Sequence, residues 1–478
     1  MPGGPRGRAG HGNGGEELVT VRFNEAHLTA LSYAARLSSE LTADVVVTRD
    51  LLGRNGLLVI TDQDIPEDIV GEYKRDTHPF TAPVPIARPG DMFSPDLILK
   101  SRDLRRHYAT EAPGSRVYVL ERGVVGAGWL RAKSVNAPRV TFYGYKGGVG
   151  RSTAAFFLAE YAARQNLAVL VIDLDLECPG ISTMLAPDMS DWPSHGVLDH
   201  LVEYPHGTEN GLQLVSRATS IPSQSPQEGV WFTPASGSLG DYFTPSGGRG
   251  GALDIPQNYG YLDKLSRVYA NVPRANSNEQ ILFGDRLEAA VSFAETQFER
   301  MAGKKPDITI LDSRSGMHDI AAAAISQLGG VSLLFAQDNP QTWVGYRELF
   351  SRWSQHLDAD DLDALRQRIQ MVSAITPDAT SDTYDKYVRR FADNSQACFA
   401  ATLYDPESGE MEEGAFNFSP NDEAAPHYPL IIRHASELVG VAVGTQPKAA
   451  DIVMPAAHYD EFCTSVLSLL REMGFKNV

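Results

Sequence analysis

The fold of this chain is decided by the stretch Tyr145-Lys146-Gly147-Gly148-Val149-Gly150-Arg151-Ser152-Thr153. An apolar, strand-like segment (residues 139–144) precedes it, and a helix-like segment (residues 152–165) follows it. Strand, glycine-rich turn and helix, in this order, are the context that a phosphate-binding loop requires. Glycines let successive backbone N–H groups converge on phosphate oxygens, and the helix start adds the positive end of its dipole. We therefore expect a phosphate site here, which a side chain at Gly147, Gly148 or Gly150 would block.

Two further segments end an apolar run on carboxylates. One is Leu170-Val171-Ile172-Asp173-Leu174-Asp175, and the other is Thr309-Ile310-Leu311-Asp312-Ser313-Arg314-Ser315-Gly316. A strand-end aspartate that only caps the next turn is the plain alternative. The order of the three segments along the chain favours a nucleotide site. Arg314 and His318 lie close enough in sequence to suggest catalytic roles, but a surface salt bridge or a partner contact explains either residue and is the favoured interpretation.

Taken together, the three segments resemble those of the MinD/ParA group of P-loop ATPases, whose Walker A loop is a deviant one. Lys146 stands where that group has an additional lysine, and Ser152 matches the hydroxyl residue that binds Mg²⁺. Two positions depart from the pattern, because Tyr145 replaces the first glycine and Arg151 replaces the general P-loop lysine. The KGGVGR spelling is similar to that of a bacterial subgroup of these ATPases.

The resemblance implies ATP as the nucleotide and Mg²⁺ as the cofactor. It assigns nucleotide binding to Lys146, Gly147, Gly148, Val149, Gly150, Arg151, Ser152, Thr153 and Gly316, and metal binding to Ser152, Asp173 (through a water) and Asp312. It makes Asp175 the residue that positions the attacking water. Lys146 is implied to reach across a dimer interface to the partner's phosphates, and Gly316 to serve as a hinge near the γ-phosphate. ATP rather than GTP rests on the resemblance alone, because Val372-Ser373-Ala374-Ile375-Thr376-Pro377 lacks the Asn-Arg or Asn-Lys pair common in MinD-like proteins.

From residue 136 onward, apolar strand-like runs alternate with helix-like runs. Strands are expected at residues 139–144, 167–173, 230–233, 308–312, 332–336, 370–375 and 429–432, and helices at 152–165, 283–301, 344–357 and 460–473. This alternation predicts an α/β fold with a doubly wound, mostly parallel sheet, as in a P-loop NTPase domain. The domain is expected to span residues 136–478, with a long insertion at about 188–282.

The N-terminal part is expected to form a disordered tail (residues 1–15) and a smaller α/β accessory domain (residues 16–135). Within that domain we expect strands at residues 19–23, 45–47, 57–60 and 117–120, a helix capped by Asn24 that runs to Leu41, and a proline-rich loop at residues 78–95. No catalytic motif occurs there. The accessory domain and the insertion are the two candidate docking sites for a protein partner.

The composition limits the function classes. With 42% hydrophobic and 21% charged residues, the chain is typical of a soluble globular protein. Residues 1–135 carry equal numbers of acidic and basic side chains, so the net charge of −18 lies in the ATPase part and disfavours nucleic acid as a partner. The three cysteines form no CxxC pair, which favours the cytoplasm and disfavours an iron–sulfur carrier. No apolar stretch is long enough to cross a membrane, and membrane binding is disfavoured.

Two functions stay open. The first is an ATP-dependent switch that dimerises with ATP, hydrolyses it slowly and controls a partner protein. The second is a nucleotide-binding scaffold with little hydrolysis, for example in bacterial signalling or phage defence, which the replacements at Tyr145 and Arg151 favour. A bacterial tyrosine kinase is disfavoured, because the last fifteen residues contain no tyrosine cluster.

Overall fold

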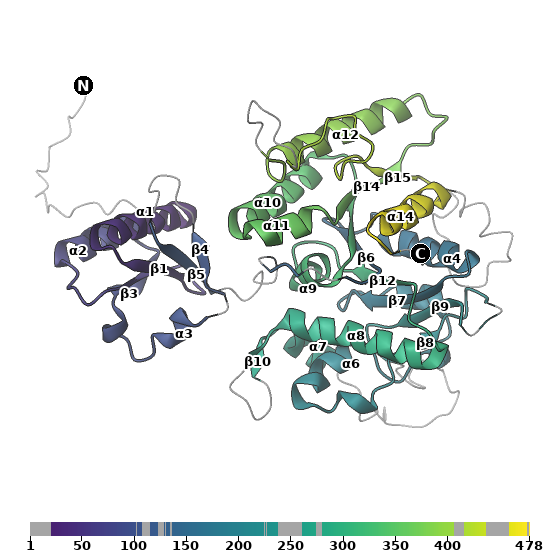
Figure 1. Cartoon of the computed structure of the whole chain (residues 1–478), viewed down its shortest axis with the longest axis horizontal. Coiled ribbons are helices and arrows are strands. Elements are labelled where there is room, and N and C mark those ends of the chain that lie inside the picture. The colour runs from purple at the N-terminus through teal and green to yellow at the C-terminus, as the bar shows by residue number, and fades with distance from the viewer. Residues whose placement is uncertain are drawn as a thin grey trace, which may run out of the picture. The chain divides into compact units, whose positions relative to one another are not determined.

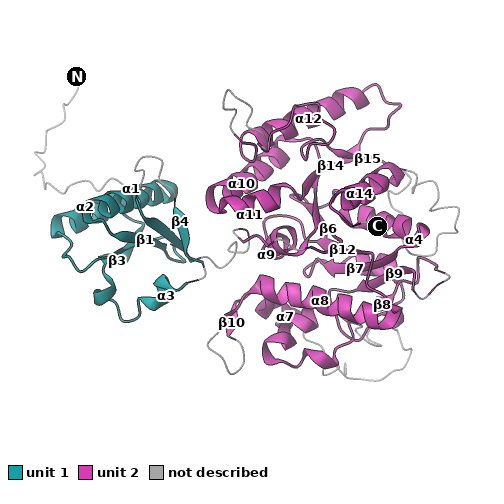
Figure 2. Ribbon diagram, viewed as in Figure 1, with its two compact units in different colours: residues 1–124 teal, residues 125–478 magenta. Residues whose placement is uncertain are grey.

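The computed structural model describes residues 21–101, 103–107, 115–122, 129, 131–133, 136–223, 225, 227–237, 261–273, 280–405, 415–435, 458–475 and 478. The chain divides into two compact units, Met1–Val124 and Val125–Val478, which are coloured separately in Figure 2. The expected tail at residues 1–15 and part of the expected insertion, residues 238–260, lie outside the described residues.

The first unit is a small α/β domain with a five-stranded sheet in the order β3-β2-β1-β5-β4 (Figure 1). Its strands are β1 (Asp44–Arg49), β2 (Asn55–Ile60), β3 (Thr81–Ala87), β4 (Arg105–His107) and β5 (Val117–Glu121), and its helices are α1 (Phe23–Leu41), α2 (Glu67–Thr77) and α3 (Asp96–Leu99). Helix α1 has three fully buried alanines, Ala26, Ala30 and Ala34. Because they are four residues apart, they lie on one face of the helix, and this face packs against the sheet.

Two expectations for this unit are wrong. Residues Val21–Phe23 form no strand, because α1 already begins at Phe23, and the N-cap is Arg22 rather than Asn24. The Glu25 carboxylate accepts the Arg22 backbone N–H at 2.7 Å and so fixes this earlier start. The proline-rich segment also contains a strand, β3, which pairs with β2 at the edge of the sheet through an irregular register. An edge strand tolerates Pro83 and Pro85 because one side of its backbone needs no ladder hydrogen bonds.

The second unit contains an eight-stranded sheet in the order β15-β14-β13-β6-β12-β7-β9-β8. The strands are β6 (Arg139–Gly144), β7 (Ala168–Leu174), β8 (Ser216–Arg217), β9 (Gly229–Thr233), β12 (Ile308–Ser313), β13 (Val331–Ala336), β14 (Ile369–Thr376) and β15 (Leu430–Arg433). All neighbours pair in parallel except β8 and β9, which are antiparallel. A separate two-stranded ribbon joins β10 (Val272–Pro273) to β11 (Gln280–Ile281).

Helices cover both faces of this sheet, which confirms the doubly wound α/β fold (Figure 1). On one face lie α4 (Arg151–Arg164), α5 (Ile181–Leu185) and α14 (Asp460–Glu472). On the other lie α6 (Val197–Glu203), α7 (Tyr261–Val268), α8 (Phe283–Ala302), α9 (Asp319–Ala323), α10 (Pro340–His356), α11 (Ala359–Arg366) and α12 (Tyr384–Ala400). The strand residues alternate accordingly, since Phe142 packs towards α4 and α14 whereas Tyr143 packs towards α10.

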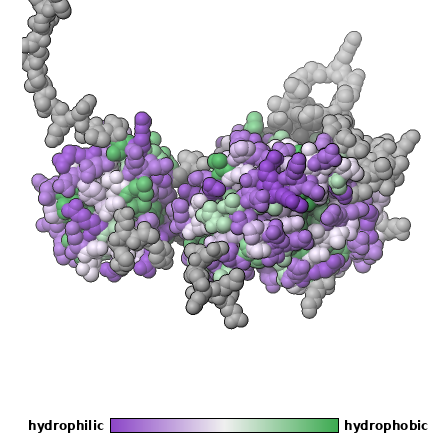
Figure 3. All heavy atoms as spheres, turned by 90° about the horizontal axis from the view of Figure 1, so that it is seen from above, coloured by the Kyte–Doolittle hydropathy of each residue, from purple (hydrophilic) through white to green (hydrophobic). Residues whose placement is uncertain are grey.

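All strands and helices expected in this unit form, with small shifts at their ends. The largest shift is in α10, which begins at Pro340 rather than at residue 344, because the Asn339 side chain accepts the Thr342 N–H and caps the helix. Part of the expected insertion belongs to the sheet, since β9 extends it beside β7. None of the helices among the described residues is long and apolar enough to cross a bilayer. In the view of Figure 3, hydrophilic side chains cover most of the visible face of this unit.

The order of the strands along the sheet reverses at its centre. Strand β6 lies between β12 and β13; the chain continues from β6 to β7, on the side of β12, and later crosses to β13 on the other side. In open α/β sheets, ligands bind outside the carboxyl ends of the strands at such a switch point. The glycine-rich stretch leaves the carboxyl end of β6 at that position.

Candidate functional site

The glycine-rich loop joins β6 to α4 in a conformation that needs glycine. Gly148 and Gly150 have φ of +74° and +77°, and Gly150 is the residue that precedes α4. A Cβ on either glycine would meet no protein atom within 4 Å. Glycine is therefore needed at these positions for the positive φ and not for lack of space. Within the described part of the chain, the backbone N–H groups from Gly147 to Gly150 donate to no protein group. Together with the start of α4, they can serve an anion.

The two departures from the expected loop both pack into the protein. The ring of Tyr145 lies against α10, where a Cβ on Gly345 would come within 2.4 Å of it. Arg151 is only 8% exposed, and its guanidinium donates to the backbone carbonyl of Ser313 at the end of β12. Arg151 therefore ties the start of α4 to the end of a neighbouring strand.

Two buried carboxylates meet beside the loop. Asp173 on β7 and Asp312 on β12 are paired in the register of these parallel strands, and they are 0% and 1% exposed. Burial, and next to it the charge of Asp312, raises the pKa of Asp173. Burial also raises the pKa of Asp312. The charge of Arg151 and a hydrogen bond from Ser152 lower that pKa and so offset part of the rise. Ionising both carboxylates is therefore costly, and a further cation nearby would lower that cost.

The residues expected to bind Mg²⁺ fit a metal that is delivered with a nucleotide. Asp312 Oδ1 is buried and has no hydrogen-bond partner among the described residues. Asp173 accepts from Ser182 Oγ at 2.9 Å and from the Asp175 N–H at 3.2 Å, so both of its oxygens are already engaged. Among the described residues, no cluster of three or more His, Cys, Asp or Glu could hold a metal by itself. Phosphate oxygens and water would complete the shell, as is usual for Mg²⁺.

Asp175 and Gly316 flank this pair on the segments that follow β7 and β12. Burial raises the pKa of the Asp175 carboxyl, and the charge of Arg151 opposes that rise. Asp175 Oδ1 accepts the Cys178 N–H at 3.2 Å. The Gly316 N–H donates to the carbonyl of Gly144 at 3.1 Å, so in this conformation it is bound to the strand that precedes the loop. With φ of +81°, Gly316 has the backbone freedom that a hinge needs.

The remaining expected residues of the loop differ in exposure. Val149 is buried and packs into the core beneath α4, which anchors the loop. Ser152 and Thr153 are half-buried at the start of α4. Lys146 is half-buried and has no ion-pair partner in the part of the chain that the structure describes. The structure thus brings all of the expected site residues to one end of the sheet.

The sequence singled out Arg314 and His318, but no sequence pattern indicated the residues that they contact. Glu177 lies 2.5 Å from Arg314 and 3.5 Å from His318, and it also accepts the hydroxyl of Tyr269. The hydroxyl of Tyr261, at the start of α7, donates to the carbonyl of Leu176. Tyr261 and Tyr269 belong to the expected insertion, more than eighty residues from their partners, and no local pattern announces such contacts.

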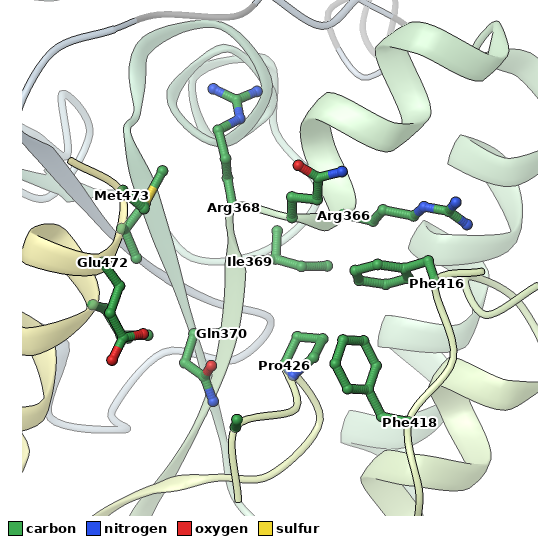
Figure 4. A pocket seen from close by; sticks show the side chains of 13 residues that line it. Arg366, Arg368, Ile369, Gln370, Phe416, Phe418, Pro426, Glu472 and Met473 are labelled. Atoms are coloured by element: carbon green, nitrogen blue, oxygen red, sulfur yellow. The ribbon is translucent and has the colours of Figure 1, made fainter. Parts of the chain in front are cut away.

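A cavity of about 290 Å³ lies elsewhere, at the amino ends of β13 and β14 (Figure 4). Apolar side chains, among them Ile369, Phe416 and Phe418, form much of its lining. Arg366 and Arg368 reach its wall, but their guanidinium groups donate to Leu403, Asp405, Ala364 and Gly329. The cavity presents apolar and polar surface in similar amounts, at the end of the sheet opposite to the phosphate loop.

This site and fold define a nucleotide-binding protein of the P-loop class. Residues 140–374 match the CobQ/CobB/MinD/ParA nucleotide binding domain. The matched segment begins in β6, ends in β14 and includes the glycine-rich loop, Asp173 and Asp312. The chain thus contains a nucleotide-binding domain of the MinD/ParA family. No curated protein matches the chain.

Several solved structures are similar at low identity. A ParA family ATPase from Chlorobium tepidum TLS has 11% identity and a TM-score of 0.38, with 70% of this chain and 97% of that chain covered. MinD in a MinC:MinD cell division complex from Aquifex aeolicus has 12% identity and a TM-score of 0.37, with 70% and 95% covered. A McdA–ATP complex from Cyanothece has 14% identity and a TM-score of 0.37, with 70% and 98% covered. At these values the likenesses carry no information on what this chain binds or does.

Proposed function

We propose that this protein is an ATP-binding molecular switch of the MinD/ParA type, in the KGGVGR subgroup, that hydrolyses ATP slowly. The observation that carries the proposal is the pair Asp173 and Asp312, buried side by side at the carboxyl ends of β7 and β12. A buried pair of carboxylates is costly to ionise, and a Mg²⁺–nucleotide complex beside the loop removes that cost. A glycine-rich turn without a ligand would not need the pair.

Each proposed residue has a role that its position allows. The N–H groups of Gly147, Gly148, Val149 and Gly150, with those at the start of α4, would bind phosphate oxygens. Ser152 and Asp312 would hold Mg²⁺ directly, and Asp173 would do so through a water. Bound Mg²⁺ neutralises charge on the phosphate oxygens. Asp175, on the segment after β7, would orient the water that attacks the terminal phosphate.

We further propose that ATP drives two copies of the chain together. Lys146 supports this, because it has no ion-pair partner among the described residues while Arg151 is bound within its own subunit. A lysine in that position can reach the phosphates of a second copy. The protein partner would dock on the N-terminal unit or on residues 188–282, and we place the protein in the cytoplasm. The negative charge of the ATPase part disfavours nucleic acid and anionic membranes as partners.

A second candidate function is a nucleotide-binding scaffold with little turnover. The buried guanidinium of Arg151 favours it, because a group that donates to the Ser313 carbonyl is not directed at the loop. Arginine keeps the charge of the usual lysine, but its planar head must be placed differently. The two candidates make the same prediction for binding and opposite ones for turnover.

One pair of measurements tests the proposal. Calorimetric titration with ATP should show saturable binding that weakens strongly when EDTA removes Mg²⁺, and phosphate release should exceed a blank without protein. Binding without phosphate release supports the scaffold. Arg151→Lys separates the two further, since it should raise turnover if the arginine limits the chemistry. Absence of Mg²⁺-dependent ATP binding would falsify the proposed function.

A further inference from the structure

Glu177 joins three segments that are far apart in the sequence. It follows β7, it pairs with Arg314 and His318 of the segment after β12, and it accepts the hydroxyl of Tyr269, directly after α7. The ring of Tyr269 also packs edge-on against His318, with the ring centres 4.7 Å apart. The Glu177 side chain is 19% exposed and that of Arg314 is 32% exposed, so this ion pair is partly shielded from water. Such a pair holds both segments more firmly than a fully exposed one does.

Arg314 lies close to the groups that would surround the terminal phosphate. The next residue, Ser315, places its Oγ 3.4 Å from where a Cβ on Gly147 would be. Gly316 then bonds to Gly144, directly before the loop. The charge of Arg314 is also among those that act on Asp175. Arg314 thus belongs to a segment that lies against the phosphate loop. Its charge acts on the proposed water-positioning residue, and its side chain pairs with Glu177.

We propose that Arg314 contacts the terminal phosphate during hydrolysis and that Glu177, fixed by the hydroxyl of Tyr269, holds it away in the conformation described here. This inference rests on the proposed function. A positive charge placed at the transferring phosphoryl group stabilises the charge that develops there, which is the main electrostatic contribution available in phosphoryl transfer. The guanidinium of Arg314 cannot keep its ion pair with Glu177 and bind the phosphate fully at the same time.

The position of Tyr269 is set by α8 and by the rest of the insertion. The buried guanidinium of Arg286, on α8, donates to the carbonyls of Val268 and Ala270 on either side of Tyr269. Lys264 on α7 pairs with Asp199 on α6 at 2.5 Å. A partner that moves α7 would therefore move the hydroxyl that fixes Glu177. The contact between Tyr269 and Glu177 is the step at which such a partner would control turnover.

Removing this one hydroxyl tests the inference. Tyr269→Phe should raise the kcat for ATP by about ten- to hundredfold, the range expected for the loss of one hydrogen bond to a charged group, and should leave the Kd for ATP unchanged. Adding Arg314→Ala should cancel the rise, because the released group is then absent. Tyr261→Phe is the matched control. It removes a hydroxyl bonded to the backbone of Leu176, one residue away, and should not raise kcat.

The outcomes separate this inference from the proposed function. Wild-type protein that does not bind ATP in calorimetry would overturn both. If the wild type binds and hydrolyses ATP, an unchanged or lowered kcat in Tyr269→Phe would overturn the inference alone. A rise that persists in the double variant, or one that Tyr261→Phe reproduces, would also overturn it, since general loosening of the segment would then be the cause.

Discussion

Asp173 and Asp312 are direct neighbours across β7 and β12, and both are buried at the carboxyl ends of their strands. Hydrogen bonds satisfy both oxygens of Asp173, whereas one oxygen of Asp312 has no partner in the described part of the chain. Such an arrangement opposes folding when both groups are charged. Residues that lower the stability of the fold are typical of functional sites.

The first prediction is that Asp312→Asn stabilises the protein while it removes Mg²⁺-dependent ATP binding. Burial and Asp312 raise the pKa of Asp173 above its value in the unfolded chain. The wild type therefore loses stability as the pH rises above about 4, because ionisation costs more in the folded state. Without the second charge this loss should shrink, and urea unfolding in EDTA at pH 8 should show a gain of about 1–3 kcal/mol.

Asp307→Asn is the control for this substitution. Asp307 lies just before β12, at its other end, where it pairs with Lys304 and accepts the Ala168 N–H. Its replacement should destabilise the fold and leave ATP binding intact. A destabilised Asp312→Asn protein that still binds ATP in a Mg²⁺-dependent way would contradict the metal assignment.

The second prediction concerns the conformation of the loop. Gly150→Val should abolish ATP binding, because a branched residue resists the φ of +77° and its side chain would fill the space where the N–H groups converge. Gly303→Val is an unusually close control, since Gly303 has φ of +78° and equally open surroundings at the end of α8. Calorimetry should show lost binding only in Gly150→Val, although both proteins should be destabilised by about 1–2 kcal/mol. Equal ATP affinity in the two variants would rule out the loop as the phosphate site.

The third prediction is that assembly depends on Lys146. Lys146→Ala should bind ATP more weakly and stay monomeric in light scattering with a non-hydrolysable analogue, whereas the wild type should dimerise. Lys304→Ala, which removes an equal charge beside Asp307, should dimerise as the wild type does. Wild-type protein that remains monomeric at saturating analogue would exclude the dimer model.

The sequence predicted the centre of the fold better than its edges. Strands β6, β7, β12 and β13 are mostly apolar runs because helices cover both of their faces, and such runs are recognisable without tertiary information. Strand β3 escaped prediction because its prolines are compatible with a strand only at the edge of a sheet, and sequence alone does not give edge position.

Motifs in the sequence located the candidate site residues, but the contacts of these residues were not predictable. Spacing located Arg151, yet only the fold shows that its head is bound to the Ser313 carbonyl. The same holds for Glu177, whose partner Tyr269 is 92 residues away. The direction of a side chain and its long-range contacts depend on packing, and local periodicity in the sequence does not predict packing.

The fourth prediction is an acid sensitivity that depends on His200. The imidazole of His200 on α6 is 1% exposed, lies against Tyr204 and Phe293, and its burial lowers its pKa to about 4. The unfolded chain binds its proton near pH 6.5, so stability falls as the pH drops from 6.5 towards 4. His200→Phe should therefore lose less stability than the wild type between pH 7.5 and 5, by about 1–2 kcal/mol in urea unfolding.

His206→Gln, at an exposed position on the following turn, is the control and should behave like the wild type. Identical pH dependence in wild type and His200→Phe would show that this burial does not govern acid stability.

The fifth prediction is that Asp175 separates nucleotide binding from turnover. Its carboxylate accepts the Cys178 N–H, so Asp175→Asn keeps an acceptor for this turn and removes only the charge, whereas Asp175→Ala removes both. Both variants should keep most of the ATP affinity, accumulate the ATP-bound dimer and lose turnover by about 10²–10⁴, which corresponds to about 3–5 kcal/mol of barrier. Asp188→Asn, which alters a similar turn that holds the Ser190 N–H, should leave turnover unchanged. Phosphate release measured against a blank without enzyme decides the matter. If Asp175→Asn turns over like the wild type, Asp175 does not orient the water, and the charge that does must come from elsewhere in the site.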